Sequence, residues 1–288
     1  MLSHISITCF AASYLVAWLL EITRLLFRSG VRGALMLGFA SAGLVAHSLF
    51  LGYRALHAPG PPLSSSYDWY LLAAWMLAVA FLYLAWLYPR SGVGLFLWPL
   101  TLGLIVAAAF FADPEPIAPE PASQIWGAAH GIALLLGDVA VMFGFIGGLM
   151  YLVQAWRLKR HVLRDGGPRL PSLEWLERVN SRVVFVSAAL VSVGFAAGIV
   201  LNRVGGRTLM PWTDPVVWSS GLMLAWLLAA AAFNVVYRPA RHGRKVAYLT
   251  VASFGFLLLS LAVLLGLDTR HGGQKAERQR AAAEEGAR

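Results

Sequence analysis

The chain of 288 residues is 59% hydrophobic and only 13% charged, and its formal net charge is +9. A soluble domain carries roughly a quarter charged residues, so the composition excludes an ordinary soluble protein and predicts a membrane protein. The positive charge does not predict nucleic-acid binding, because most basic residues lie in short loops between apolar blocks. The single cysteine, Cys9, excludes an internal disulfide and a C-x-x-C redox or haem-attachment motif.

Eight apolar blocks follow one another along the chain, each near the ~20 residues that cross a bilayer. They are continuously apolar rather than alternating, which favours helices over a β-barrel. We therefore predict an all-α fold, a polytopic transmembrane helical bundle of about eight spans, with a single domain over 1–267. A polar tail over 268–288 is predicted to be disordered. The predicted spans cover residues 5–26, 33–54, 70–88, 93–112, 126–155, 181–201, 215–237 and 246–267.

The distribution of basic residues predicts an orientation. The loops after spans one, three, five and seven are the basic ones, and they share one side by parity. The positive-inside rule places that side in the cytoplasm, so both termini are expected on the outer side. Between spans five and six, Leu173, Leu176 and Val179 repeat at helical spacing. They predict an amphipathic helix that lies on the inner membrane surface.

Histidines in or beside the spans are the first candidate functional residues. His47 lies in span two, His130 at the outer start of span five, and His271 just after span eight. An ionisable group inside a span costs free energy unless it has a partner, which makes it a functional candidate by default. The alternative for His47 is a hydrogen bond to a neighbouring helix that only supports packing.

Aromatic and basic residues are expected near the same outer face. Trp212 and Trp218 offer flat apolar surfaces, and Arg203 and Arg207 offer partners for anions. Together with axial histidines, such residues suit a flat apolar ring that carries a metal and two carboxylates. The alternative is that these residues are interface anchors, because Trp and Arg gather at membrane interfaces for that reason alone.

Asp138 is a carboxylate inside span five, where insertion costs roughly 2.5–3.5 kcal/mol. It is therefore expected to be paired, protonated or facing water, and a proton relay is one interpretation. A proton-coupled transporter is the corresponding alternative function. The sequence contains no evident inverted repeat or broken midplane helix, which argues against it.

Four stretches resemble, in their order and spacing, the cytochrome c assembly family of haem-handling membrane proteins (CcsA, CcmC and the shorter HemX-type relatives). The resemblance extends from about residue 45 to 268. The stretches are PLSSSYDWYLLAAW at 62–75, the Trp-x3-His helix and its basic end at 126–160, LEWLERVNSR and the following span at 173–203, and the closing pair of spans at 221–266.

The resemblance implies where haem is held. The family carries a tryptophan-rich, Asp-Pro-containing haem motif in the outer loop before the penultimate span, and MPWTDPVVW at 210–218 occupies that place. Its candidate residues are Trp212, Asp214 and Trp218. His130 matches the outer histidine that precedes this loop, and His271 lies close to the expected second one. The inner-leaflet histidine of the family is replaced around Val236.

The function implied is a haem-binding or haem-presenting accessory of cytochrome c maturation in a bacterial inner membrane, and not an enzyme. The expected partners are the lipid bilayer, other cytochrome c assembly proteins and apocytochrome c. A membrane scaffold of the HemX type, which influences tetrapyrrole synthesis through the basic inner loop, is a further alternative. The roles implied are metal ligation by His130 and His271, contact with the porphyrin by Trp212, Asp214, Trp218 and His47, and pairing with propionates by Arg203 or Arg207.

Overall fold

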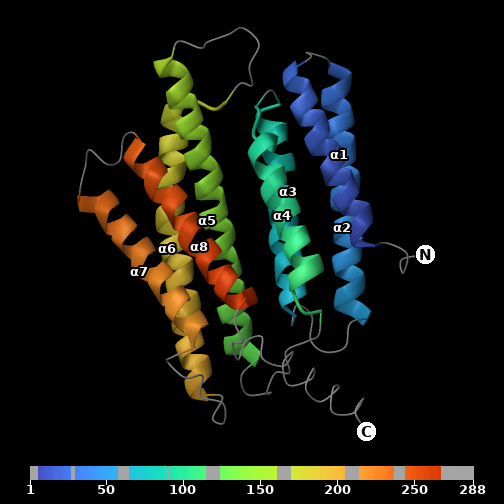
Figure 1. Ribbon diagram of the computed structural model, residues 1–288. Helices are drawn as coiled ribbons and strands as arrows, with labels where there is room; N and C mark the ends of the chain where they lie inside the picture. The colour runs from blue at the N-terminus through green and yellow to red at the C-terminus, as the bar shows by residue number, and fades with distance from the viewer. Residues whose placement is uncertain are drawn as a thin grey trace. The chain divides into compact units, whose positions relative to one another are not determined.

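A computed structural model describes residues 6–26, 30–57, 65–89, 91–114, 124–160, 170–204, 214–236 and 244–266. Within these ranges the chain forms eight α-helices (Figure 1). The helices are α1 (Ile7–Leu26), α2 (Gly30–His57), α3 (Ser66–Leu87), α4 (Gly94–Phe111), α5 (Gln124–Lys159), α6 (Leu173–Val204), α7 (Pro215–Val236) and α8 (Arg244–Gly266).

Every predicted span forms a helix, so the all-α polytopic fold is confirmed. Among the described residues, seven helices are long and apolar enough to cross a membrane, and α1 contributes a shorter apolar stretch, Ile7–Thr23. The sidedness of the termini stays a prediction, as does the single domain over 1–267. The polar tail at 268–288 lies outside the described residues.

The separate amphipathic helix predicted at the inner surface is corrected by the structure. Its residues are the first two turns of α6, which runs without a break from Leu173 to Val204. Ser172 begins the helix by accepting the backbone N–H of Trp175 on its hydroxyl, at 3.3 Å. Residues 173–183 include neither Gly nor Pro, so nothing in the sequence ends the helix before the apolar span begins.

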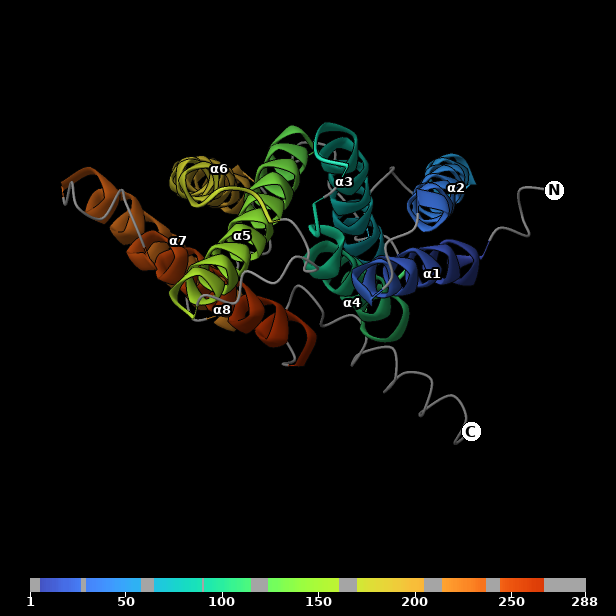
Figure 2. The same cartoon turned by 90° about the horizontal axis from the view of Figure 1, so that it is seen from above.

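The chain packs as two compact units. Unit 1 consists of Met1–Ala118 and Leu149–Leu176, and unit 2 of Pro119–Gly148 and Glu177–Arg288. In unit 1 the packed pairs are α1 with α2, α2 with α3, α3 with α4, and α4 with α1. The four helices therefore close around one core, as the view from above shows (Figure 2).

Aromatic side chains fill the core of unit 1. Trp98 of α4 is fully buried, and Tyr14 of α1 stacks on it with ring centroids 4.9 Å apart. Phe81 of α3 packs against the same indole at 4.5 Å. Gly94 permits this packing, because a Cβ there would lie 2.7 Å from the Phe81 ring.

Glycines of α5 hold the helices of unit 2 close together. A Cβ on Gly137 would lie 2.7 Å from Val191 of α6, and one on Gly148 would lie 2.9 Å from the backbone oxygen of Ala247 in α8. Small residues at helix contacts are the usual device for close packing in membranes. The small residues of α5 therefore have a structural role in this unit.

Candidate functional site

His130 lies in the second turn of α5, half-buried at one end of unit 2. Its Nδ1 lies 2.7 Å from the backbone oxygen of Gly194 on α6. A carbonyl oxygen only accepts hydrogen bonds, so Nδ1 carries the proton and donates it. In the neutral ring the Nε2 lone pair is then left for another partner, and none is present among the described residues. Histidines that bind metals are held in this way, with the second ring nitrogen donating to a carbonyl or carboxylate.

Four helix termini lie toward the His130 end of unit 2. They are the start of α5, the end of α6, the start of α7 and the end of α8 (Figure 1). Trp126 lies one helical turn before His130 and is 41% exposed, and Trp218 in the first turn of α7 is 69% exposed. Arg203 is exposed in the last turn of α6. The structure thus brings two tryptophans and one arginine to the same end of the unit as His130.

Asp214 and Pro215 begin helix α7. Asp214 is only 5% exposed, and its Oδ1 accepts the backbone N–H of Val216 at 2.8 Å. Its carbonyl oxygen accepts the N–H of Trp218 at 3.2 Å. An aspartate N-cap followed by a proline in the first helical position is a favourable start for a helix. The Asp-Pro pair therefore holds Trp218 in place, a role that the sequence analysis did not predict.

Three of the predicted site residues, Trp212, Arg207 and His271, lie outside the described residues. Their roles as porphyrin contact, propionate partner and metal ligand stay predictions. Among the described residues, no group of three or more His, Cys, Asp or Glu side chains is arranged to hold a metal ion.

His47 is enclosed in the aromatic core of unit 1. It is 0% exposed, and its ring stacks on Phe10 with centroids 4.1 Å apart and an interplanar angle of 2°. The Tyr14 hydroxyl lies 3.3 Å from its Nδ1. Its Nε2 is buried without a hydrogen-bond partner. This environment favours the packing interpretation of His47 over the cofactor interpretation, because aromatic side chains occupy the space around the ring.

We expect replacement of His47 by alanine to lower the free energy of unfolding by about 2–5 kcal/mol, because it leaves a cavity in a packed core. The double variant His47→Phe with Tyr14→Phe should stay within about 1.5 kcal/mol of the wild type, since both hydrogen-bonding partners become apolar together. Unfolding in detergent measures both effects, and the haem content of the folded double variant tests whether His47 binds haem. Loss of bound haem from the folded double variant would show that His47 is a ligand.

A polar cluster ties together three helix ends of unit 1. Arg54 near the end of α2 donates from Nε to Oδ1 of Asp68 at 2.6 Å, and its guanidinium lies over the Tyr67 ring at 4.6 Å. A second nitrogen of Arg54 donates to the carbonyl of Pro114, which follows α4. Ser65 caps α3 by accepting the N–H of Asp68 on its hydroxyl, which in turn donates to Oδ2 of the same residue. The PLSSSYDW stretch thus contains a structural clamp; its Ser-x-x-Asp spacing is the available sequence signal.

Asp138 is half-buried in α5. Among the described residues its carboxylate has no hydrogen-bond or ion-pair partner. The structure therefore places no relay of titratable groups beside it within the described parts of unit 2.

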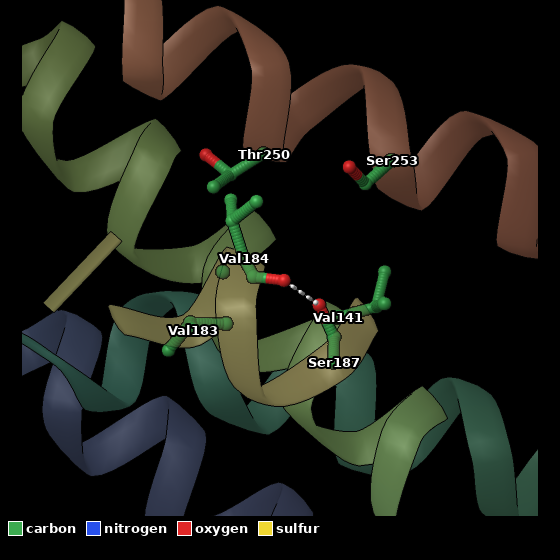
Figure 3. Close-up of a pocket in the computed structure, with 7 residues that line it drawn as sticks. Val141, Val183, Val184, Ser187, Thr250 and Ser253 are labelled. Carbon is green, nitrogen blue, oxygen red and sulfur yellow. Dashed lines mark hydrogen bonds between the residues drawn. The ribbon is translucent and has the colours of Figure 1, made fainter. Parts of the chain in front are cut away.

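A narrow crevice lies between α5, α6 and α8 in unit 2 (Figure 3). Its empty volume is about 150 Å³, against the ~300–1,000 Å³ usual for ligand pockets. Its hydroxyl groups donate to carbonyls of their own helices; Ser187, for example, donates to the carbonyl of Val184 at 3.1 Å. The crevice is too small for a porphyrin and is a feature of helix packing. It is lined by Val141, Gly144, Val183, Val184, Ser187, Thr250 and Ser253.

Curated proteins similar to this chain carry the description "Cytochrome c biogenesis protein CcsA". The one from Synechococcus elongatus is 24% identical over 264 residues, covering 76% of this chain and 80% of the relative. Those from Picosynechococcus sp. and Gloeobacter violaceus are each 22% identical, covering 78% and 79% of this chain and 82% and 81% of the relative. The chain is similar to proteins of the cytochrome c assembly family. No family model matches the chain, and no solved structure matches it.

The similarity to the cytochrome c assembly family confirms the resemblance that the four sequence stretches indicated. It covers more than three quarters of the chain and so includes most of the apolar helices. With seven helices among the described residues long and apolar enough to cross a membrane, the protein is a multi-pass membrane protein that is similar to cytochrome c biogenesis proteins.

Proposed function

We propose that the protein is a membrane accessory of cytochrome c maturation, which binds haem at the His130 end of unit 2 and presents it to apocytochrome c. The description of the relatives as cytochrome c biogenesis proteins supports the process. The single observation that carries the haem site is the hydrogen bond from Nδ1 of His130 to the Gly194 carbonyl. Because Nδ1 is engaged by this carbonyl, Nε2 is the ring nitrogen that is left to act as a ligand.

The residues at this end of unit 2 fit a haem. Haem supplies an iron that takes a histidine nitrogen and two propionates that take cationic partners. His130 offers the nitrogen, Trp126 and Trp218 offer exposed aromatic surface, and Arg203 offers an exposed guanidinium. Trp212, Arg207 and His271 belong to the same proposed site by their place in the sequence. Asp214 contributes to the site by capping the start of α7, the helix that carries Trp218.

The distribution of charge supports an outward-facing site. The opposite end of unit 2 carries Arg178 and Arg182 at the start of α6, and Arg244 and Lys245 at the start of α8. The positive-inside rule places that end in the cytoplasm, so His130 lies on the outer side of a bacterial inner membrane. The single cysteine, Cys9, supplies no paired-thiol chemistry. The thiols for covalent attachment belong to apocytochrome c, and the protein acts as an assembly factor and not as an enzyme.

Deletion of the gene in its native host tests the proposed function. We expect covalently bound haem in the c-type cytochromes to fall strongly, because the proposal makes the protein a part of their maturation. Haem staining of membranes after denaturing electrophoresis measures this. A wild-type copy and an Asp138→Asn copy should both restore the cytochromes, because the proposal gives Asp138 no part.

Two outcomes would contradict the proposal. Unchanged c-type cytochromes, together with altered levels of tetrapyrrole precursors, would favour the scaffold alternative. Failure of Asp138→Asn alone to restore the cytochromes would favour a proton-coupled transporter.

A further inference from the structure

The contact between α5 and α6 in unit 2 has a regular antiparallel register. His130 lies against Gly198, Leu134 against Gly194, Gly137 against Val191, and Gly147 against Asn180. The first two steps along α5, of four and three residues, are matched by equal steps back along α6, and the ten residues from Gly137 to Gly147 are matched by eleven residues from Val191 back to Asn180. At each of these levels a side chain of one helix lies on a glycine of the other. Backbone and side chain therefore meet directly along this contact, and a group at one level has a fixed neighbour across it.

The His130 ring lies directly on Gly198. A Cβ built on Gly198 would be 2.7 Å from Nδ1 and 2.8 Å from Cε1 of the imidazole. Contacts under 3 Å essentially never occur for a Cβ, so with any side chain at position 198 either the ring or the helix contact must shift. Gly198 lies one helical turn beyond Gly194, whose carbonyl accepts the Nδ1 proton. One turn of α6 backbone thus determines both the hydrogen bond and the place of the ring.

We propose that Gly198 is a positioning residue for His130, which seats the imidazole so that Nδ1 reaches the Gly194 carbonyl and Nε2 is presented as a ligand. The inference rests on the proposed haem site for its functional meaning. The contact between Gly198 and the His130 imidazole, called the seat below, is a property of the protein without haem. A glycine that only permits close packing acts through the distance between the helices. Gly198 acts in addition through the imidazole it touches.

Gly137 is the matched control. Its added Cβ would also meet α6 at 2.7 Å, on a methyl of Val191, and at 3.3 Å on the Val191 backbone nitrogen. Gly137→Ala therefore disturbs the same helix contact two turns from His130 without touching the ring. An effect of Gly198→Ala that Gly137→Ala lacks belongs to the seat.

The first experiment uses the protein without haem. Nitrogen NMR of detergent-solubilised protein carrying ¹⁵N-labelled histidine, with the His130 signals assigned from His130→Ala, reports which ring nitrogen holds the proton. We expect the Nδ1–H form of His130 in the wild type and in Gly137→Ala, and its loss in Gly198→Ala. Retention of that form in Gly198→Ala would overturn the proposal.

The second experiment is a thermal-unfolding cycle, which remains informative if Gly198→Ala folds poorly. We expect Gly198→Ala to lower the melting temperature less in a His130→Ala background than in the wild type, because the clash is with the ring. An equal decrease in both backgrounds would mean that the added methyl acts on helix packing alone, and would contradict the seat.

Titration with haem separates the seat from the proposed function. We expect Gly198→Ala to bind haem at least about tenfold more weakly, as loss of an orienting partner does at metal sites, with Gly137→Ala close to the wild type. If the wild type takes up no haem, the proposed function fails, whereas the NMR result still decides the seat. If the wild type binds haem through His130 and the two glycine variants behave alike, the seat fails and the function stands.

Discussion

Replacement of His130 by alanine is expected to leave the purified protein with less than about a tenth of the haem of the wild type, because it removes the only described nitrogen directed for ligation at this end of unit 2. The Soret absorption and the haem-to-protein ratio of the detergent-purified protein measure the loss. His130→Gly leaves a cavity of imidazole shape, so added imidazole should restore the Soret band in that variant. Restoration would show that the variant loses haem because the imidazole is missing, and not because the protein is misfolded.

His57 provides the matched control for this prediction. Its Nδ1 lies 3.0 Å from the carbonyl oxygen of Tyr53, so its ring is held by the same kind of hydrogen bond as that of His130, but in unit 1. His57→Ala should leave the haem content unchanged. Equal losses in the two variants would indicate nonspecific binding of haem by histidines and would contradict the assignment.

Removal of the Asp68 carboxylate is expected to destabilise unit 1 by roughly 2–4 kcal/mol, somewhat below the ~3–5 kcal/mol for breaking a fully buried ion pair. The reduction reflects Arg54, whose side chain is 20% exposed and partly solvated. Asp68→Ala leaves the guanidinium beside Pro114 without its carboxylate and removes the partner of Ser65 at the start of α3. Unfolding of the detergent-solubilised protein by denaturant measures the change in free energy.

A double-mutant cycle tests whether the cluster acts as one unit. Arg54→Ala and Asp68→Ala should together cost clearly less than the sum of the two single changes, because each alone already breaks the ion pair. Full additivity would show that the two side chains stabilise the protein independently. His130-dependent haem binding should persist in the folded Asp68→Ala variant, since the clamp lies in unit 1.

The helices could be predicted from the sequence because each apolar block is continuous and long enough to cross a bilayer. Their ends could not, because helices extend beyond the hydrocarbon wherever the chain contains no breaker. Helix α5 continues to Lys159, beyond the predicted end at residue 155, and α6 begins at Leu173, so that the predicted surface helix is part of it. Hydrogen bonding of the backbone favours continuing an existing helix over starting a second one.

The site could be predicted only in part. His47 and His130 look alike in the sequence, since each is a histidine in an apolar helix. Packing distinguishes them, because Phe10 and Tyr14 enclose His47, whereas the Gly194 carbonyl orients His130. Tyr14 lies 33 residues from His47 in the sequence, and Gly194 lies 64 residues from His130. No local sequence pattern indicates either partner.

Two helix caps could have been predicted from the local sequence. Asp214-Pro215 has the residue types of an N-cap and first helical position, and Ser65 and Asp68 have the spacing of a capping box. The ion pair from Asp68 to Arg54 joins two helices, and so it required the structure. The resemblance to a haem-handling family drew attention to Asp214 as a haem contact, whereas its geometry makes it the cap of the helix that carries Trp218.

The absorption spectrum of the wild-type protein, purified in mild detergent from its native membrane, tests the central claim most directly. The proposal predicts a Soret band whose position and intensity change in His130→Ala and which imidazole restores in His130→Gly. A purified, folded protein without a Soret band after haem is added, or with a band that is the same in the wild type and in His130→Ala, would contradict it.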